Sequence, residues 1–163
     1  MSIIKNLPDN FNILSPVAFR FETRKIPNVT YFVQTANIPG MSTSEFLRET
    51  PFKAIPTVGD TLEVETLDIT FVVDEDLANY QEIINWLKGM TSPENFNNVM
   101  PNMYSDATLT ILTNSMNANK LITFYDMFPT SLSAISLESN VDDISPITAD
   151  VSFQIRDYSI DKL

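Results

Sequence analysis

Carboxylates are the side chains of this sequence with the most obvious capacity for chemistry. Eight of them lie between residues 60 and 82 with no lysine or arginine among them: Asp60, Glu63, Glu65, Asp68, Asp74, Glu75, Asp76 and Glu82. Carboxylates bind calcium or magnesium, and a pair of them can hydrolyse a glycosidic bond. Asp74 and Asp76 match the start of a calcium loop, but the glycine that such a loop needs does not follow. Helix capping and a solvated acidic surface are therefore the favoured interpretation.

The residue types that are missing exclude most other chemistry. The 163 residues include no cysteine and no histidine, and the only glycines are Gly40, Gly59 and Gly89. Disulfides, thiolate or histidine metal sites and Ser-His-Asp catalysis are therefore impossible. The three glycines are too far apart for a phosphate-binding loop or a dinucleotide fingerprint. We expect no catalytic residue, no bound metal and no cofactor.

The net charge bears on partners. Twenty-one acidic residues against ten basic ones give a charge of −11. Nucleic-acid binders and proteins on anionic membranes use clusters of lysine and arginine, and the densest one here is only Arg20, Arg24 and Lys25. The first residues lack the apolar core of a signal peptide, and no apolar run reaches the ~18 residues of a membrane span. We expect no membrane anchor.

The pattern of apolar residues predicts elements within one domain spanning 1–163. Residues 1–15 lack a regular period and are expected to form an N-terminal arm. Alternation over 17–22 and 28–36 predicts two half-buried strands, joined as a hairpin. The segment 41–60 has no sustained period and carries prolines, so we expect an extended interaction loop there.

The second half of the chain adds one helix and more strands. Apolar residues alternate again over 61–73, which predicts a long strand. The alternation changes parity at 65–66, so we expect a β-bulge or bend in that strand. Helical spacing of apolar residues predicts a helix over about 75–88, with Asp74 as its N-cap and Gly89 as its C-terminal stop. Trp86, on the flank of this helix, is expected in the core. Further strands are predicted at 108–113, 121–128, 133–137 and 147–155.

These elements predict a mainly β fold, an antiparallel sandwich or barrel with one flanking helix. The polar turn 114–119 joins two of the strands, and Phe128–Thr130 is expected to end that pair. An acidic turn is expected at 140–143. Seven residues at inward positions are expected in the core: Val17, Phe19, Phe21, Ile69, Phe71, Val151 and Phe153.

The order of these elements resembles the tail tube proteins of contractile-tailed bacteriophages and the related tube proteins of contractile injection systems and type VI secretion. Four stretches covering about 16–160 carry the resemblance. They are the hairpin ending in Ala36-Asn37-Ile38-Pro39-Gly40; Val58-Gly59-Asp60 leading into the strand 67–73; Asp74-Glu75 followed by the helix with Ile83-Ile84-Asn85-Trp86; and Phe128-Pro129-Thr130 followed by a short strand, a turn and a terminal strand ending Asp157-Tyr158.

The resemblance implies a non-enzymatic structural subunit. Six copies form a ring, each gives four strands to one barrel facing a lumen, and rings stack into a hollow tube. The implied partners are other copies, sheath and baseplate proteins, a tape measure protein in the lumen, and DNA that passes without specific binding. Such a protein is made in the host cytoplasm, without a signal peptide, and ends in the virion tail.

Two residue sets are candidates for these roles. An acidic wall repels phosphates, so polar strand positions are candidates for the lumen: Glu22, Glu63, Glu65, Asp68 and Asp150. The extended loop supplies candidates for contacts between subunits: Phe52, Lys53 and Ile55.

Other functions stay open at this point. One is a baseplate-proximal initiator or a terminator, which shares the sandwich but does not stack indefinitely. A tube protein of an injection system fits equally well, because its lumen need not carry DNA. More remote alternatives are a carboxylate enzyme or metal-binding β-sandwich, and an acidic mimic of DNA.

Overall fold

A computed structural model describes residues 11–91, 103–139 and 145–163. These ranges contain nine strands and two helices, and the predicted mainly β, antiparallel fold is confirmed. In chain order the elements are β1 (Phe19–Thr23), α1 (Pro27–Phe32), β2 (Val33–Ala36), β3 (Met41–Arg48), β4 (Ile55–Val64), β5 (Leu67–Val72), α2 (Ala78–Thr91), β6 (Ser105–Leu112), β7 (Ala118–Leu132), β8 (Thr148–Gln154) and β9 (Asp157–Lys162).

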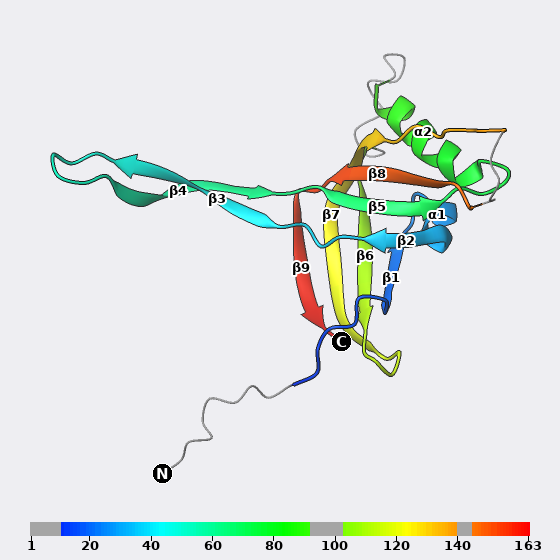
Figure 1. Cartoon of the computed structure of the whole chain (residues 1–163), viewed down its shortest axis with the longest axis horizontal. Helices are drawn as coiled ribbons and strands as arrows, with labels where there is room; N and C mark the ends of the chain where they lie inside the picture. The colour runs from blue at the N-terminus through cyan, green and yellow to red at the C-terminus, as the bar shows by residue number, and fades with distance from the viewer. Residues whose placement is uncertain (1–10, 92–102, 140–144) are drawn as a thin grey trace, which may run out of the picture.

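Seven strands form one hydrogen-bonded sheet that folds over on itself at β7. The order is β1-β6-β7-β8-β5-β2, and β9 also pairs with β7. Residues 120–124 of β7 pair with both β6 and β9, whereas residues 128–132 pair with β8. We call β1, β6, the first part of β7 and β9 sheet A, and the last part of β7 with β8, β5 and β2 sheet B. Strands of the two sheets cross at a steep angle (Figure 1), as in an orthogonal sandwich.

The bend in β7 explains how one strand serves both sheets. Asp126 has a φ of 51°, a conformation that aspartate tolerates better than most residues. Its backbone N–H donates to the Asp106 carboxylate at 3.1 Å, and its own carboxylate pairs with Arg156. The pairing of β6 with β7 ends at Met127, as predicted for Phe128–Thr130, but the strand itself runs on through Pro129 to Leu132 and pairs there with β8. The register shift next to Pro129 accommodates a residue without an N–H.

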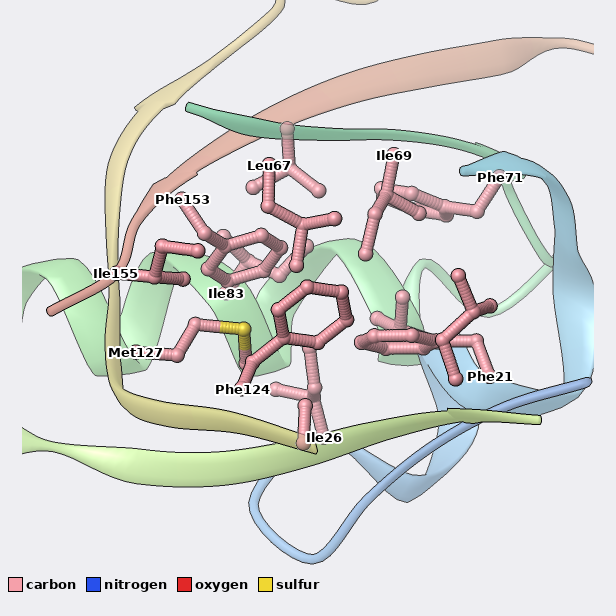
Figure 2. Packing of buried hydrophobic residues seen from close by; sticks show 14 of the residues in the cluster. Phe21, Ile26, Leu67, Ile69, Phe71, Ile83, Phe124, Met127, Phe153 and Ile155 are labelled. Atoms are coloured by element: carbon pink, nitrogen blue, oxygen red, sulfur yellow. The ribbon is translucent and has the colours of Figure 1, made fainter. Parts of the chain in front are cut away.

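The core lies between the sheets and α2. Phe21, Phe71, Phe124 and Phe153 are at most 2% exposed, and their side chains point toward one another (Figure 2). Trp86 of α2 is buried as predicted and packs on Phe153, with ring centroids 5.9 Å apart. Among the seven predicted core residues, Phe21, Ile69, Phe71, Val151 and Phe153 are buried and Phe19 packs against the cluster. Val17 is 79% exposed, because it precedes β1 and lies outside the sandwich.

The predicted strand at 28–36 is wrong over its first half. Residues 27–32 form α1, and only 33–36 are extended. Pro27 starts the helix, where its fixed φ and missing N–H cost nothing. Ile26 and Val29 are fully buried. They are three residues apart, which is the spacing of residues on one face of a helix. The predicted hairpin is also absent, since β1 pairs with β6 and β2 pairs with β5.

The main helix is displaced from its predicted bounds. It begins at Ala78 because Leu77 has a φ of 57°, which no helical residue adopts. Asp74 is therefore not the N-cap residue, but its carboxylate still accepts from the Asn79 N–H at 3.4 Å. Gly89 lies within the helix rather than ending it.

Other differences concern segments that leave the sandwich. Residues 133–137 form no strand, and the predicted turn at 140–143 lies outside the described residues. The segment 41–60, expected as an extended loop, belongs to a hairpin of β3 and β4 that projects from the body (Figure 1). The chain changes course at 65–66 as the change of parity predicts, but this point separates β4 and β5, which belong to different sheets, and is not a bend within one long strand. Strand β9 was not predicted as an element separate from β8.

Candidate assembly surfaces

The β3–β4 hairpin is the most exposed element of the molecule. No residue of either strand is buried. Cross-strand pairing puts Thr43 opposite Leu62, Glu45 opposite Val58 and Leu47 opposite Pro56, all on one face. An isolated two-stranded ribbon is at best marginally stable in water, and exposed apolar faces of this kind are typical of interaction surfaces. We call it the hairpin apolar face: Met41, Leu47, Pro56, Val58, Leu62 and Val64.

The root of the hairpin is held to the body by hydrogen bonds. The Asp68 N–H donates to the Asn37 side-chain oxygen at 2.7 Å, and the Asn37 N–H donates to the Asp68 carbonyl at 3.1 Å. The Glu65 N–H donates to the Gly40 carbonyl at 3.0 Å. Tyr158 of β9 donates its hydroxyl to the Pro39 carbonyl at 2.9 Å. The direction in which the hairpin projects is therefore set by contacts with β5 and β9.

The tip of the hairpin carries the three predicted inter-subunit residues. Phe52 is 99% exposed, the largest exposed fraction among the large hydrophobic side chains of the described residues. Lys53 donates its N–H to the Thr50 hydroxyl at 3.2 Å, which shapes the turn. Ile55 begins β4 and is 49% exposed. These residues lie together, and none of them is buried by the body.

Sheet A has a polar outer face. Rows of residues cross its four strands, such as Glu22–Thr108–Thr123–Ser159 and Arg20–Thr110–Leu121–Asp161. Four carboxylates and one arginine give this face a charge of −3, that is +1 − 4. We call it the sheet A outer face: Arg20, Glu22, Asp106, Thr108, Thr110, Leu121, Thr123, Tyr125, Asp157, Ser159 and Asp161.

The five acids predicted to line a lumen occupy three places. Only Glu22 lies on the sheet A outer face, where its carboxylate pairs with Arg20 at 2.6 Å. Asp68 and Asp150 lie on neighbouring rows of the outer face of sheet B, and Asp150 accepts from the Thr70 hydroxyl at 2.6 Å. Glu63 and Glu65 lie at the base of the hairpin. Within one copy these five acids do not share one surface.

Sequence reasoning missed three acids of the sheet A outer face. Asp157 and Asp161 of β9 lie opposite Tyr125 and Leu121, and Asp106 lies on β6 beside the buried Ala107. A signal for two of them was present, because Asp157, Ser159 and Asp161 alternate with Tyr158 and Ile160. That run is short and follows the stronger pattern of β8.

The described residues offer little chemistry beyond packing and charge. No group of three acidic side chains among them is placed to hold a metal ion. Lys25 lies with its ammonium 4.4 Å from the centre of the Trp86 ring, and burial lowers the pKa of Lys25 from its usual 10.5. No helix of the described ranges is long and apolar enough to cross a bilayer.

Comparison by sequence finds no matching family model and no matching curated protein. Comparison by structure finds many matches over nearly the whole chain. A chain of the extended sheath–tube complex of PVC, an extracellular contractile injection system, has a TM-score of 0.64 at 13% identity, over 94% of both chains. The tube terminating cap of the anti-feeding prophage has a TM-score of 0.65 at 12% identity, over 100% of both chains. Hcp1 from Flavobacterium johnsoniae has a TM-score of 0.51 at 10% identity, over 88% of this chain and 94% of that chain.

The fold therefore belongs to a recognisable class. Its structural neighbours are tube and cap components of contractile injection systems and Hcp of type VI secretion, in agreement with the resemblance drawn from the sequence. At identities of this size the likeness establishes the fold, and the function has to be argued from the surfaces.

Proposed function

We propose that this chain is a structural, non-enzymatic subunit of the tube of a contractile tail or injection system. Six copies form a ring, and rings stack into a hollow tube. The observation that carries the proposal is sheet A, a four-stranded sheet with a polar outer face, whose two outermost strands, β1 and β9, each have one partner among the described residues. A sheet with open edges invites pairing with another copy, and ring closure removes every such edge.

The dimensions of such a ring suit a tube. Four strands from each of six copies make a barrel of 24 strands. With strands ~4.8 Å apart and tilted by ~40°, the circumference is roughly 150 Å and the backbone diameter roughly 48 Å. A duplex of DNA or a folded effector passes through such a bore once side chains are added.

The charge of the sheet A outer face supports a lumen role for it. Four carboxylates on this face, repeated in every copy, create a negative wall. Such a wall repels the phosphates of DNA, so an anionic cargo slides without binding. Of the residues predicted from the sequence, Glu22 shares this face, and we add Asp106, Asp157 and Asp161. Asp68 and Asp150 then face away from the lumen, toward a sheath.

The hairpin supplies the contacts between copies. Its tip, with Phe52, Lys53 and Ile55, and most of its apolar face are solvent-exposed in a single copy. At the base of the hairpin, Val64 of this face packs against the core. In a tube they lie against a neighbouring subunit or ring, and the apolar area removed from water stabilises the stack. The further partners that we propose for this protein are sheath, baseplate and tape measure proteins. A virion tail is one assembly in which it can act.

A second candidate is a tube terminating cap. The observation that favours it is the likeness to the cap of the anti-feeding prophage, which extends over all of both chains. A cap forms the same ring but does not stack indefinitely.

Negative-stain microscopy of the purified chain over a range of concentrations tests the proposal. A tube subunit forms six-fold rings that stack into tubes of varied length, whereas a cap forms rings or pairs of rings only. The variant Phe52→Ser should reduce stacking, and Leu137→Ser, which changes an 81% exposed side chain away from the hairpin, serves as its control. A monomer at every concentration would contradict both candidates.

A further inference from the structure

Sheet A ends in two strands that each have one partner. Within the described residues, β1 pairs only with β6 and β9 pairs only with β7. The outward edges of β1 and β9 therefore present backbone donors and acceptors that a further strand can bind. A strand of another chain can complete the sheet at either of these edges.

The directions of the strands decide how two copies can meet. Neighbouring strands in β1-β6-β7-β9 are all antiparallel, so β1 and β9 run in opposite directions. In copies related by rotation about a ring axis, each strand keeps its direction relative to that axis. The β9 strand of one copy therefore meets the β1 strand of the next in antiparallel orientation, and the alternation continues around the ring.

A groove lies along the open edge of β1. It has a volume of about 600 Å³ and runs between β1 and the segment of α1 and β2. Two of its apolar side chains are largely uncovered, Tyr31 at 84% and Val17 at 79% exposure. Phe19 and Phe21, which face the core side of sheet A, form its other wall. Arg20 lines the groove as well, so the groove lies beside the open edge of β1 and reaches from there to the core side of the sheet.

Strand β9 carries an apolar side chain on the same side of the sheet. Tyr158 and Ile160 lie opposite Phe124 and Ile122, both of which are buried. Tyr158 is partly buried and packs near Phe124, with ring centroids 6.0 Å apart. Ile160 is 54% exposed, although the residue opposite it is fully buried. Its own sandwich does not cover it.

We propose that β9 of one copy lies antiparallel along β1 of the next copy and that Ile160 enters the groove between β1 and α1, against Tyr31. The inference rests on the proposed function, and it names the two edges and the side chain that close the ring. It covers Ile160, Tyr31 and Val17 with apolar neighbours. The charged side chains of Arg20, Glu22, Asp157 and Asp161 stay on the sheet A outer face.

The absence of cysteine in the chain makes disulfide trapping a clean test. Double variants combine Arg20→Cys or Glu22→Cys with Asp157→Cys, Ser159→Cys or Asp161→Cys, all on the sheet A outer face. Within one copy these positions are separated by three strand spacings, roughly 14 Å, which a disulfide cannot span. A bond must therefore join two copies. Because a two-residue shift moves the partner by about 7 Å, the pair that reacts best also gives the register.

Three outcomes are possible after mild oxidation of assembled protein. A ladder of linked species up to six copies from at least one double variant, with dimers at most from each single variant, supports the inference. Rings in the microscope without a ladder from any pair would overturn it and leave the proposed function standing. Absence of rings would overturn both.

A substitution in the groove contact provides a second readout. Ile160→Asp should leave the monomer folded, since this side chain is already more than half exposed, and should raise the concentration needed for ring formation at least tenfold. Leu137→Asp is the matched control and should change it less than twofold. Equal effects of the two variants would contradict the seating of Ile160 in the groove.

Discussion

The backbone of Ser44 leaves no room for a side chain at Gly59 on the facing strand of the hairpin. A Cβ atom on Gly59 would lie 2.6 Å from the Ser44 carbonyl oxygen, closer than real Cβ atoms come. The register between β3 and β4 shifts next to this point, between Thr43 and Glu45. Gly59 therefore permits a close approach of two backbones that shapes the whole projecting hairpin.

The variant Gly59→Ala should deform the hairpin and leave the sandwich folded. Amide hydrogen exchange in β3 and β4 should become faster, while exchange in β7 and β8 stays unchanged, and ring stacking should weaken. Gly89→Ala is the control, because nothing lies within 4 Å of a Cβ atom there and the residue is inside α2. That change should raise the free energy of unfolding by about 0.5–1 kcal/mol. Unchanged exchange in β3 and β4 of Gly59→Ala would contradict this role.

Two phenylalanines separate folding from assembly. Phe153 is fully buried against Trp86, so Phe153→Ala should lower the free energy of unfolding by about 3–5 kcal/mol, measured by urea denaturation. Phe52 is 99% exposed, so Phe52→Ala should change it by less than ~0.5 kcal/mol while reducing ring stacking. A large loss of monomer stability in Phe52→Ala would show that the tip packs on its own domain.

The pH dependence of stability should carry a contribution from Lys25. Burial lowers its pKa from 10.5, so the folded protein holds this proton less tightly than the unfolded chain does. The resulting penalty is complete below the folded pKa and disappears as the pH rises from that value toward 10.5. The stability of Lys25→Met minus that of the wild type should therefore fall with rising pH over this window. The control Lys25→Arg keeps its charge at every pH in this window, so its free energy of unfolding should not rise with pH as that of the wild type does. A difference that grows with pH would contradict the assignment.

Salt should promote assembly. Each copy carries a charge of −11, and copies in a ring repel one another at long range. Raising the ionic strength from about 0.02 M to about 0.5 M shortens the Debye length and weakens this repulsion more than it weakens apolar contacts. The concentration at which rings appear in analytical ultracentrifugation should fall. A rise instead would mean that ion pairs between copies dominate the interface.

Reversing the charge of the sheet A outer face should make the tube retain DNA. Assembled Asp157→Lys/Asp161→Lys should cosediment with duplex DNA at low salt and protect it from nuclease, because these positions line the bore of the proposed tube. The control Thr148→Lys/Asp150→Lys changes the outer face of sheet B and should bind DNA that a nuclease still degrades. If DNA were protected from nuclease by the control and not by the first variant, the outer face of sheet B, and not that of sheet A, would line the bore.

The extent to which the sequence predicts this fold varies along the chain. Strand β8 was predicted well because Ala149, Val151 and Phe153 are buried on one side throughout. The α1 segment was misread because Ile26, Val29 and Val33 satisfy both helical spacing and, in part, alternation. Tertiary contacts decide such cases, and they cannot be read from a short window.

The assembly surfaces were harder to predict for a related reason. In the hairpin no position is buried in the single copy, so no buried face imposes a period on 41–60. The lumen candidates predicted from the sequence are polar positions of strands, and the sequence does not show which sheet each strand joins. Pairing of β9 with β7, rather than with its sequence neighbour β8, brings Asp157 and Asp161 beside the row of Glu22 and separates both from Asp150.

The most direct test of the central claim is a cryo-electron microscopy reconstruction of the assembled chain at side-chain resolution. We expect a ring of six copies in which β1, β6, β7 and β9 of each copy form a continuous barrel, with Thr123, Asp157 and Asp161 facing the bore. A particle whose bore is lined by β5 and β8, with sheet A against solvent on the outside, would contradict the account.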